Sequence, residues 1–353
     1  IEVEEREETI DEKQNRLKHE SLLIVNTAVH KHYREVFLRY KPAQDYAYRR
    51  WGQKYCDEIE IGFAPIDGKA LAHLPLQKEF LQELGLINPQ GYDFFQNRIV
   101  IPIKDRYQHI IGFTARVMDD SQPKYLNSKE SLLYSKRSTV FGLDVAWRAA
   151  GKTGQMYLVE GAPDCMRLHA IGVQNAVADL GSAWTVEQFQ LIKRAANKVC
   201  FIPDNDPLKG GADYGTGIEA VMKAGKLATE QHLTVSVKEI TTTEEGKKED
   251  PDTYFKNQTL FKAVEEEDFI LWLAAKLVET SGNTEQKSDA VKRIAHLLSF
   301  IDDDTKLTMF IDALTKYHRG KLFWQKAIEN ERTRRDSPKE DDIDRNRQYG
   351  FWI

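Results

Sequence analysis

The sequence predicts an α/β fold (α+β overall) with three parts: a basic, mixed α/β N-terminal subdomain, an α/β domain with a mainly parallel sheet, and a C-terminal helical bundle. Three observations support this prediction. Residues 98–118 have the pattern of a β-hairpin, residues 155–240 alternate between strand and helix patterns, and the chain after residue 252 has helical periodicity. A chain of 353 residues is also too long for one ordinary core.

The first part is predicted over residues 21–150, after a charged segment at 1–20 that has no period and is frayed or loosely helical. Ser21 can cap the first regular helix, because apolar residues recur at helical spacing directly after it. The later elements are a helix at 42–51, a strand at 59–65, a helix at 76–86, the hairpin at 98–118, a polar lysine-bearing segment at 123–136 and a short helix at 141–150.

The second part is predicted over residues 151–253, and the third over 254–333. In the second, strands are expected at 156–160, 175–179, 198–203 and 233–240, with helices near 164–170, 186–195 and 217–230. In the third, apolar stripes predict helices at 261–279, 288–300, 305–318 and 322–334. A charge-dense tail at 334–353 is predicted to be disordered.

The composition indicates a soluble globular protein of a reducing compartment. Hydrophobic residues make up 41% and charged residues 30% of the chain. No apolar run approaches the roughly 20 residues that span a bilayer, and the N-terminus does not resemble a signal peptide, so no membrane partner is expected. The three cysteines, Cys56, Cys165 and Cys200, form no C-x-x-C pair, so we expect neither zinc nor disulfides, and a cytoplasmic location.

Charge is distributed unevenly along the chain, although the net charge is only −5. Residues 97–137 contain eight Lys or Arg against four acids, whereas residues 1–14 contain seven acids against two bases. A basic middle in an acidic chain is what a local phosphate-binding surface requires. A solvated charged face is the alternative, and it is the commoner meaning of such a run.

Acidic residues follow two of the predicted strands. Glu160 ends the first, and Asp204 and Asp206 follow the third. Carboxylates at the carboxyl ends of neighbouring strands lie in the crevice where α/β sheets bind ligands. Because converging acids repel one another, a hard divalent cation is their natural partner. The sequence therefore predicts a Mg²⁺ site at this edge of the sheet.

The order of three acidic elements resembles a known family. E-G-A-P-D at 160–164, D-N-D at 204–206 and D-P-D at 250–252 are similar to the motifs of the TOPRIM domain of primases, topoisomerases and some nucleases. The stretches at 46–51, 60–65, 97–105, 111–116 and 123–130, with D-P-D-T-Y-F at 250–255, resemble the RNA-polymerase domain of DnaG-type primases. The resemblance covers roughly residues 20 to 320.

The resemblance implies roles for the acids. Asp204 and Asp206 match the metal-binding pair, with Asp250 and Asp252 joining or supporting them, and the cofactor is Mg²⁺ or Mn²⁺, with two or more ions and no zinc. Glu160 matches a glutamate that ligates metal or assists deprotonation of a hydroxyl. Asp164 is expected to face the same crevice; the alternative is an ordinary acid at a helix N-terminus.

The resemblance also implies a basic surface for template and nucleotide phosphates. Its residues are Arg50, Arg98, Arg116, Lys124 and Lys136, with Tyr125 and Asn127 shaping the groove. For any single lysine, a solvated surface position is an equally good interpretation.

The function implied is that of a DNA primase, a nucleotidyltransferase that synthesises short RNA primers from NTPs on single-stranded DNA in chromosomal, plasmid, phage or mobile-element replication. A replicative helicase is the expected partner, and the location is the bacterial cytoplasm. Departures from the family are a lengthened loop after Asp206, with Asp213 and Asp179 unassigned, and no zinc-binding domain in this sequence. Two alternatives stay open: a metal-dependent TOPRIM nuclease or strand transferase, and a non-catalytic module that recruits a replication partner.

Overall fold

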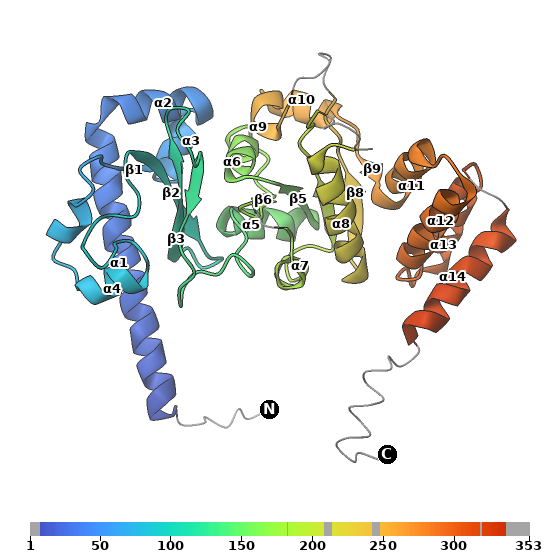
Figure 1. Cartoon of the computed structure of the whole chain (residues 1–353), viewed down its shortest axis with the longest axis horizontal. Coiled ribbons are helices and arrows are strands. Elements are labelled where there is room, and N and C mark those ends of the chain that lie inside the picture. The colour runs from blue at the N-terminus through green and yellow to red at the C-terminus, as the bar shows by residue number, and fades with distance from the viewer. Residues whose placement is uncertain (1–7, 182, 208–213, 242–247, 318–319, 337–353) are drawn as a thin grey trace.

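The three predicted parts follow one another along the longest axis of the molecule (Figure 1). A computed structural model describes residues 8–181, 183–207, 214–241, 248–317 and 320–336. An antiparallel sheet with helices, a mainly parallel sheet with helices, and a group of helices succeed one another, so the predicted fold class is confirmed. Our divisions at 150/151 and 253/254 stay predictions; they fall inside the helices α5 (Leu143–Thr153) and α9 (Pro251–Tyr254).

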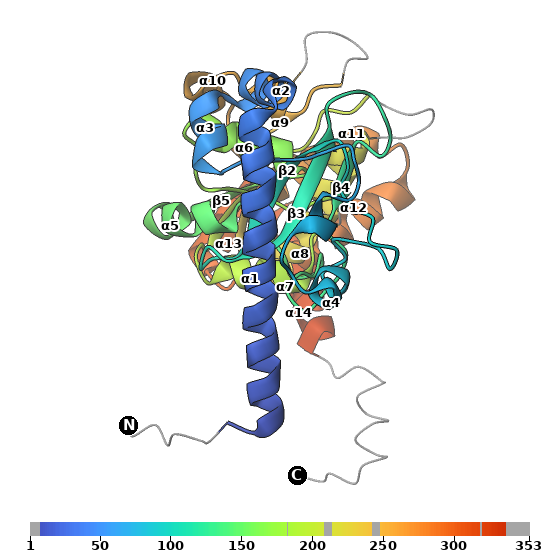
Figure 2. The same ribbon diagram turned by 90° about the vertical axis from the view of Figure 1, so that its left-hand side faces the viewer.

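The first helix is longer than predicted. α1 spans Ile10–Arg39, and Thr9 caps it: the Thr9 side chain accepts a hydrogen bond from the Glu12 N–H (3.2 Å), while Glu12 accepts one from the Thr9 N–H (2.8 Å). The prediction that Ser21 begins the helix is wrong, because this reciprocal cap starts it three turns earlier. Residues 10–20 are exposed, and this end of α1 extends beyond the body of the molecule (Figure 2).

The rest of α1 packs on a four-stranded antiparallel sheet. The strand order is β1 (Gly62–Ala64), β2 (Arg98–Lys104), β3 (Ile110–Val117), β4 (Tyr125–Asn127). A Cβ on Gly62 would lie 2.7 Å from the Tyr33 Cβ, so only glycine lets β1 approach α1 this closely. The smaller helices of this part are α2 (Lys41–Trp51), α3 (Gln53–Glu58), a 3₁₀ turn (Ala70–His73) and α4 (Lys78–Glu83).

The predicted hairpin is confirmed as β2 and β3. The segment after it was expected only to be polar, but its residues 125–127 form β4, which pairs with the edge of β3. Tyr125 lies opposite Arg116 and Asn127 opposite Thr114 in this pairing. Through β4, the lysine-bearing segment at 123–136 lies beside the α/β domain with the parallel sheet.

The second sheet has the predicted parallel strands. Its order is β6 (Ala176–Ala178), β5 (Gln155–Val159), β7 (Lys198–Phe201), β8 (Thr234–Val237), β9 (Glu267–Asp268), with only β9 antiparallel. The helices between these strands are α6 (Ala162–Ala170), α7 (Val186–Lys193) and α8 (Thr216–Glu230). β5 and β7 are neighbours, so the residues that follow them emerge at the same edge.

The C-terminal part is helical with one interruption. The prediction of a single helix at 261–279 is wrong: α10 (Gln258–Ala263) ends, β9 pairs with β8, and α11 (Phe269–Thr280) then begins. Asp268 caps α11 by accepting a hydrogen bond from the Ile270 N–H at 2.9 Å, which fixes the restart. The remaining helices are α12 (Thr284–Leu298), α13 (Asp304–Leu314) and α14 (Lys321–Asp336). Residues 337–353 of the predicted tail lie outside the described residues.

Among the helices in the described residues, none combines the length and the apolar character needed to cross a membrane.

Candidate active site between the two sheets

Three predicted acids meet at the carboxyl ends of the two central strands. Glu160 follows β5 directly, Asp204 follows β7 after two residues, and Asp206 lies two residues further on. The Ile202 N–H donates to the Leu158 carbonyl at 2.9 Å, which continues the pairing of the strands up to the acids. The parallel register thus brings the two motifs together, as the sequence predicted.

Two carboxylate oxygens of this group are buried without a hydrogen-bond partner in the described part of the chain: Glu160 Oε1 and Asp204 Oδ1. Burial, together with the charges of Asp204 and Asp206, raises the pKa of Glu160 to about 7. Burial also raises the pKa of Asp204. Buried acceptors without a donor are costly, so this arrangement is suited to a cation that would satisfy them.

A lysine outside every predicted motif, Lys248, provides a positive charge here. Lys248 Nζ lies 2.8 Å from Asp204 Oδ2 and 2.8 Å from Asp206 Oδ1. Thr216 donates a hydrogen bond to Asp206 Oδ2 at 2.5 Å. Although burial acts to raise it, the hydrogen bonds from Lys248 and Thr216 hold the pKa of Asp206 below its usual value.

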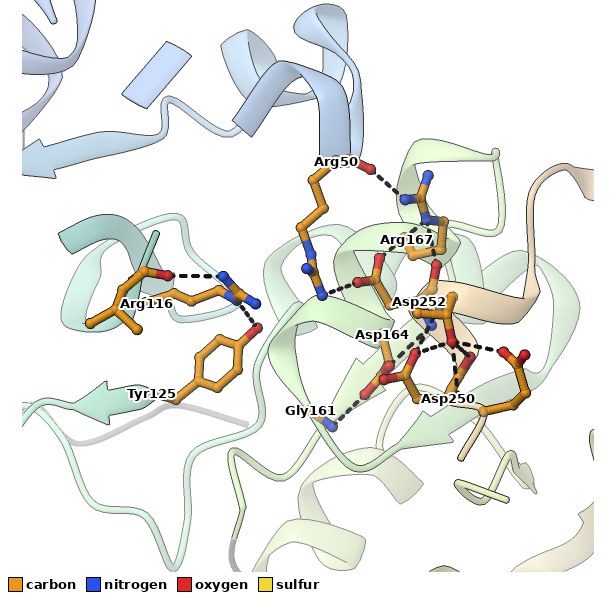
Figure 3. A network of polar contacts seen from close by, with 11 residues as sticks. Arg50, Arg116, Tyr125, Gly161, Asp164, Arg167, Asp250 and Asp252 are labelled. Atoms are coloured by element: carbon orange, nitrogen blue, oxygen red, sulfur yellow. Dashed lines mark hydrogen bonds and ion pairs between the residues drawn. The ribbon is translucent and has the colours of Figure 1, made fainter. Parts of the chain in front are cut away.

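Asp164 faces the same crevice and also belongs to a helix N-terminus. As the third residue of α6, it accepts hydrogen bonds from the Gly161 N–H at Oδ2 (3.0 Å) and from the Asp252 N–H at Oδ1 (3.1 Å) (Figure 3). Burial and the charges of Asp204, Asp250 and Asp252 raise the pKa of the Asp164 carboxyl well above its usual range. Asp164 thus ties the start of α6 to the start of α9.

The two acids of the D-P-D element have different surroundings. Asp252 is 3% exposed, and its carboxylate forms ion pairs with Arg50 and with Arg167 (Nε to Oδ1, 3.2 Å). Asp250 caps α9, because its Oδ1 accepts a hydrogen bond from the Thr253 N–H at 2.8 Å. Figure 3 shows the arginines and Asp252 in one network with Asp164. In this arrangement both carboxylate oxygens of Asp252 are paired with arginines.

A cleft of about 280 Å³ separates the acids from β4. Four residues of the predicted basic surface line it, and they face four of the predicted acids across the cleft. The lining residues are Arg50, Lys124, Tyr125 and Asn127 on one side and Glu160, Asp164, Asp204 and Asp250 on the other. The Asn127 side chain donates to the Leu180 carbonyl at 2.9 Å, a direct contact between the two sides.

The other three residues of that surface do not line the cleft. Arg98 is buried and donates to the Pro123 carbonyl at 2.9 Å, which positions the backbone before β4. Arg116 is buried between the rings of Tyr46 and Tyr125 and donates to the Tyr125 hydroxyl at 2.8 Å. Lys136 is exposed on the loop that follows β4. The structure therefore places two of the predicted arginines behind the cleft wall.

Known families match the two halves of this site in the order observed. The family described as the DNA primase catalytic core, N-terminal domain, matches residues 32–147, and a Toprim-like family matches residues 157–255. The chain carries the catalytic core of the DnaG-type primase family. A Toprim domain within a primase core implies the use of divalent metal ions.

Curated relatives named DNA primase are longer than this chain. That of Clostridium acetobutylicum is 34% identical over 220 residues, which are 60% of this chain and 36% of the relative. That of Listeria innocua is 32% identical over 72% of this chain and 40% of the relative. The chain thus spans about two fifths of the length of these primases.

Solved primase structures share the fold. The zinc-binding and RNA polymerase domains of the Aquifex aeolicus primase are 27% identical, with a TM-score of 0.69, over 87% of this chain and 75% of that one. The RNA polymerase domain of Mycobacterium tuberculosis primase, solved in complex with double-stranded DNA, is 25% identical, with a TM-score of 0.66, over 84% and 98%.

The acids of the primase core fit a divalent cation by their chemistry. Carboxylate oxygens are hard ligands, two of them are buried without donors, and an ammonium lies between two of the acids. Within the described residues, no three His, Cys, Asp or Glu side chains converge closely enough to form a complete metal site by themselves. Water or substrate oxygens would therefore have to complete the coordination, as is usual for Mg²⁺.

Several residues of this site were not predicted. Lys248 precedes the D-P-D element and belongs to no motif, and Arg167 and Thr216 lie on helices with no motif. A Cβ on Gly217 would lie 2.5 Å from the Asp204 carbonyl oxygen and 2.8 Å from Glu160 Oε1, so only glycine fits there. The one available signal was the run of glycine and threonine after D-N-D.

Two acids had no assigned role. Asp179 is buried and accepts a hydrogen bond from the Gly181 N–H at 2.9 Å; burial raises its pKa to about 7. It thus fixes the turn in which Leu180 and Gly181 have positive φ angles of 64° and 80°. Asp213 lies outside the described residues.

Proposed function

We propose that this protein is a DNA primase that synthesises RNA primers from NTPs on single-stranded DNA by metal-dependent phosphoryl transfer. One observation carries the proposal. A single cleft places incompletely satisfied carboxylates, Glu160 and Asp204, opposite a basic and aromatic wall that includes Lys124 and Tyr125. Phosphoryl transfer needs both: acids that hold cations, and cationic groups that bind phosphates.

The acids divide the work. Asp204 and Asp206 hold Mg²⁺ or Mn²⁺, two or more ions in all, with Asp250 and Asp252 extending or supporting the pair. Ions held there would supply Lewis-acid chemistry, which activates the attacking 3′-hydroxyl and offsets the charge on the leaving pyrophosphate. Glu160 accepts a proton at Oε1 or serves as a further ligand; this buried oxygen has no hydrogen-bond partner in the described residues.

The opposite wall binds and orients the substrates. Lys124 is exposed on this wall and contacts phosphates of template or nucleotide, and Arg50 reaches the same cleft while it remains paired with Asp252. Tyr125 and Asn127 shape the groove. Arg98 and Arg116 act through the backbone and the ring that they position, and Lys136 contacts the template outside the cleft.

The partners follow from this chemistry: a single-stranded DNA template, NTPs, the growing RNA primer and a replicative helicase, which we assign to the exposed faces of the C-terminal helices. The Mycobacterium tuberculosis domain solved with DNA supports a nucleic-acid ligand for this fold. The setting is the cytoplasm of a bacterium, or of a bacterium that hosts a phage or mobile element.

The test is synthesis from labelled ribonucleotides on single-stranded DNA, with Mg²⁺ or Mn²⁺. Asp204→Asn should reduce product by roughly 10³-fold, the scale expected when a catalytic electrostatic group is lost. Asp45→Asn, which removes an exposed acid of α2, is the matched control. A preformed RNA primer tests extension separately from initiation. Metal-dependent cleavage of the DNA without synthesis would instead establish the nuclease.

A further inference from the structure

Lys248 occupies a defined place between two acids of the site. Its ammonium lies 2.8 Å from one oxygen of Asp204 and 2.8 Å from one oxygen of Asp206. The backbone holds it there as well: the Asn205 N–H donates to the Glu249 carbonyl (2.8 Å), and the Glu249 N–H donates back (3.2 Å). This pair of hydrogen bonds fixes the residue before Glu249 beside the acids that flank Asn205.

The two oxygens that Lys248 contacts are the ones a bridging cation needs. Asp206 Oδ2 is engaged by Thr216, which leaves Oδ1 as the oxygen of Asp206 that faces Asp204 across the ammonium. An ammonium and a divalent ion cannot both lie within bonding distance of this oxygen pair without strong repulsion. The Lys248 side chain is 52% exposed, so the ammonium is already partly hydrated and breaking its ion pairs costs less than breaking a fully buried pair would.

We propose that Lys248 is a built-in competitor of the divalent cation: it neutralises Asp204 and Asp206 when no metal is bound and must leave them when metal binds. The inference rests on the proposed metal site. Because the contact with Asn205 keeps the backbone in place, the released ammonium stays within one side-chain length of the acids. There it can meet the phosphates of a bound nucleotide.

The experiment measures Mn²⁺ binding to the full chain without DNA or nucleotide, by electron paramagnetic resonance of the free ion. Lys248→Met should tighten Mn²⁺ binding roughly fivefold, the factor that corresponds to one solvent-accessible ion pair that no longer has to be broken. Lys248→Arg keeps a competing charge and should bind close to the wild-type value. Lys223→Met, an exposed lysine of α8, is the control for a general loss of positive charge.

A second readout guards against variants that are merely unstable. The increase in melting temperature on addition of saturating Mn²⁺ should be larger for Lys248→Met than for wild type, because the metal-free acids then lack their counter-charge. If Lys248→Met binds Mn²⁺ no more tightly than wild type while Asp204→Asn binds it clearly more weakly, the inference about Lys248 is wrong but the proposed metal site stands. If Asp204→Asn also binds Mn²⁺ like wild type, the metal site of the proposed function is wrong and the inference falls with it.

Discussion

The two walls of the cleft differ in how far their charges are already compensated. On the acidic wall, Glu160 and Asp204 each keep a buried oxygen without a donor in the described residues. Behind the basic wall, Arg98 and Arg116 are buried, and they donate hydrogen bonds to backbone carbonyls and to a tyrosine hydroxyl. The acids are thus arranged to receive a cation, whereas these arginines build the wall and leave phosphate binding to exposed residues such as Lys124.

The same contrast exists within the acids. Both carboxylate oxygens of Asp252 are paired with arginines. Asp204 pairs with Lys248 through Oδ2, and its Oδ1 has no donor in the described residues. The largest effect on stability is therefore expected at Asp252, although the largest effect on activity is expected at Asp204.

Asp252→Ala should lower the free energy of unfolding by about 3 kcal/mol, because it leaves Arg50 and Arg167 close together without their shared counter-ion. Urea denaturation measures this. Asp250→Ala is the control, since it removes only the cap of α9 and should cost about 1 kcal/mol. Equal losses in the two variants would contradict the distinction between the acids.

Glu160→Gln tests the burial of the acidic wall through the pH dependence of stability. The folded-state pKa of Glu160, about 7, lies above the ordinary value of 4.5, so the folded chain binds more protons than the unfolded chain between these values. The stability that wild type has below pH 4.5 is lost as the pH rises through 7. In metal-free buffer the glutamine should therefore stabilise the fold by about 3 kcal/mol at pH 8 and by little near pH 4.5. A gain that does not change with pH would contradict the burial of an ionisable acid here.

Lys124→Met and Arg116→Met should distinguish residues that bind DNA from residues that stabilise the fold of the basic wall. Lys124→Met should reduce the slope of log affinity for single-stranded DNA against log salt by about 0.7, with unfolding unchanged. Arg116→Met should lower the free energy of unfolding by about 2 kcal/mol, because the Tyr125 hydroxyl and the Val117 carbonyl lose a buried donor. Native gel or fluorescence titrations at several salt concentrations, with urea denaturation, measure both. The reverse pattern would show that Arg116 is the phosphate contact.

The strands and the acidic edge could be predicted from the sequence because their signals are local. Glu160 and Asp204 each follow a strand pattern. Because the two strands run parallel in the same sheet, both acids lie at the same edge of it. The start of α1 was also encoded locally, in Thr9 and Glu12, but the charged composition obscured the cap. The break before α11 was missed for a similar reason, since Asp268 reads as one acid in a run of acids rather than as a cap.

The compensation of the charges could not be predicted, because it depends on contacts between distant segments. Arg167 and Asp252 are 85 residues apart, and Arg98 meets a carbonyl 25 residues away. A pattern of basic residues indicates a phosphate-binding surface, but it does not show which of these side chains already donate their hydrogen bonds within the protein. Lys248 is the clearest case, since its place beside Asp204 depends on the backbone contact between Asn205 and Glu249.

The most direct test of the cation site is anomalous diffraction from crystals of this chain grown with Mn²⁺. We expect an anomalous peak within bonding distance of Asp204 and Asp206, with the Lys248 ammonium moved away from both. A Mn²⁺ peak only at other acids, with Lys248 still bridging the pair, would contradict it.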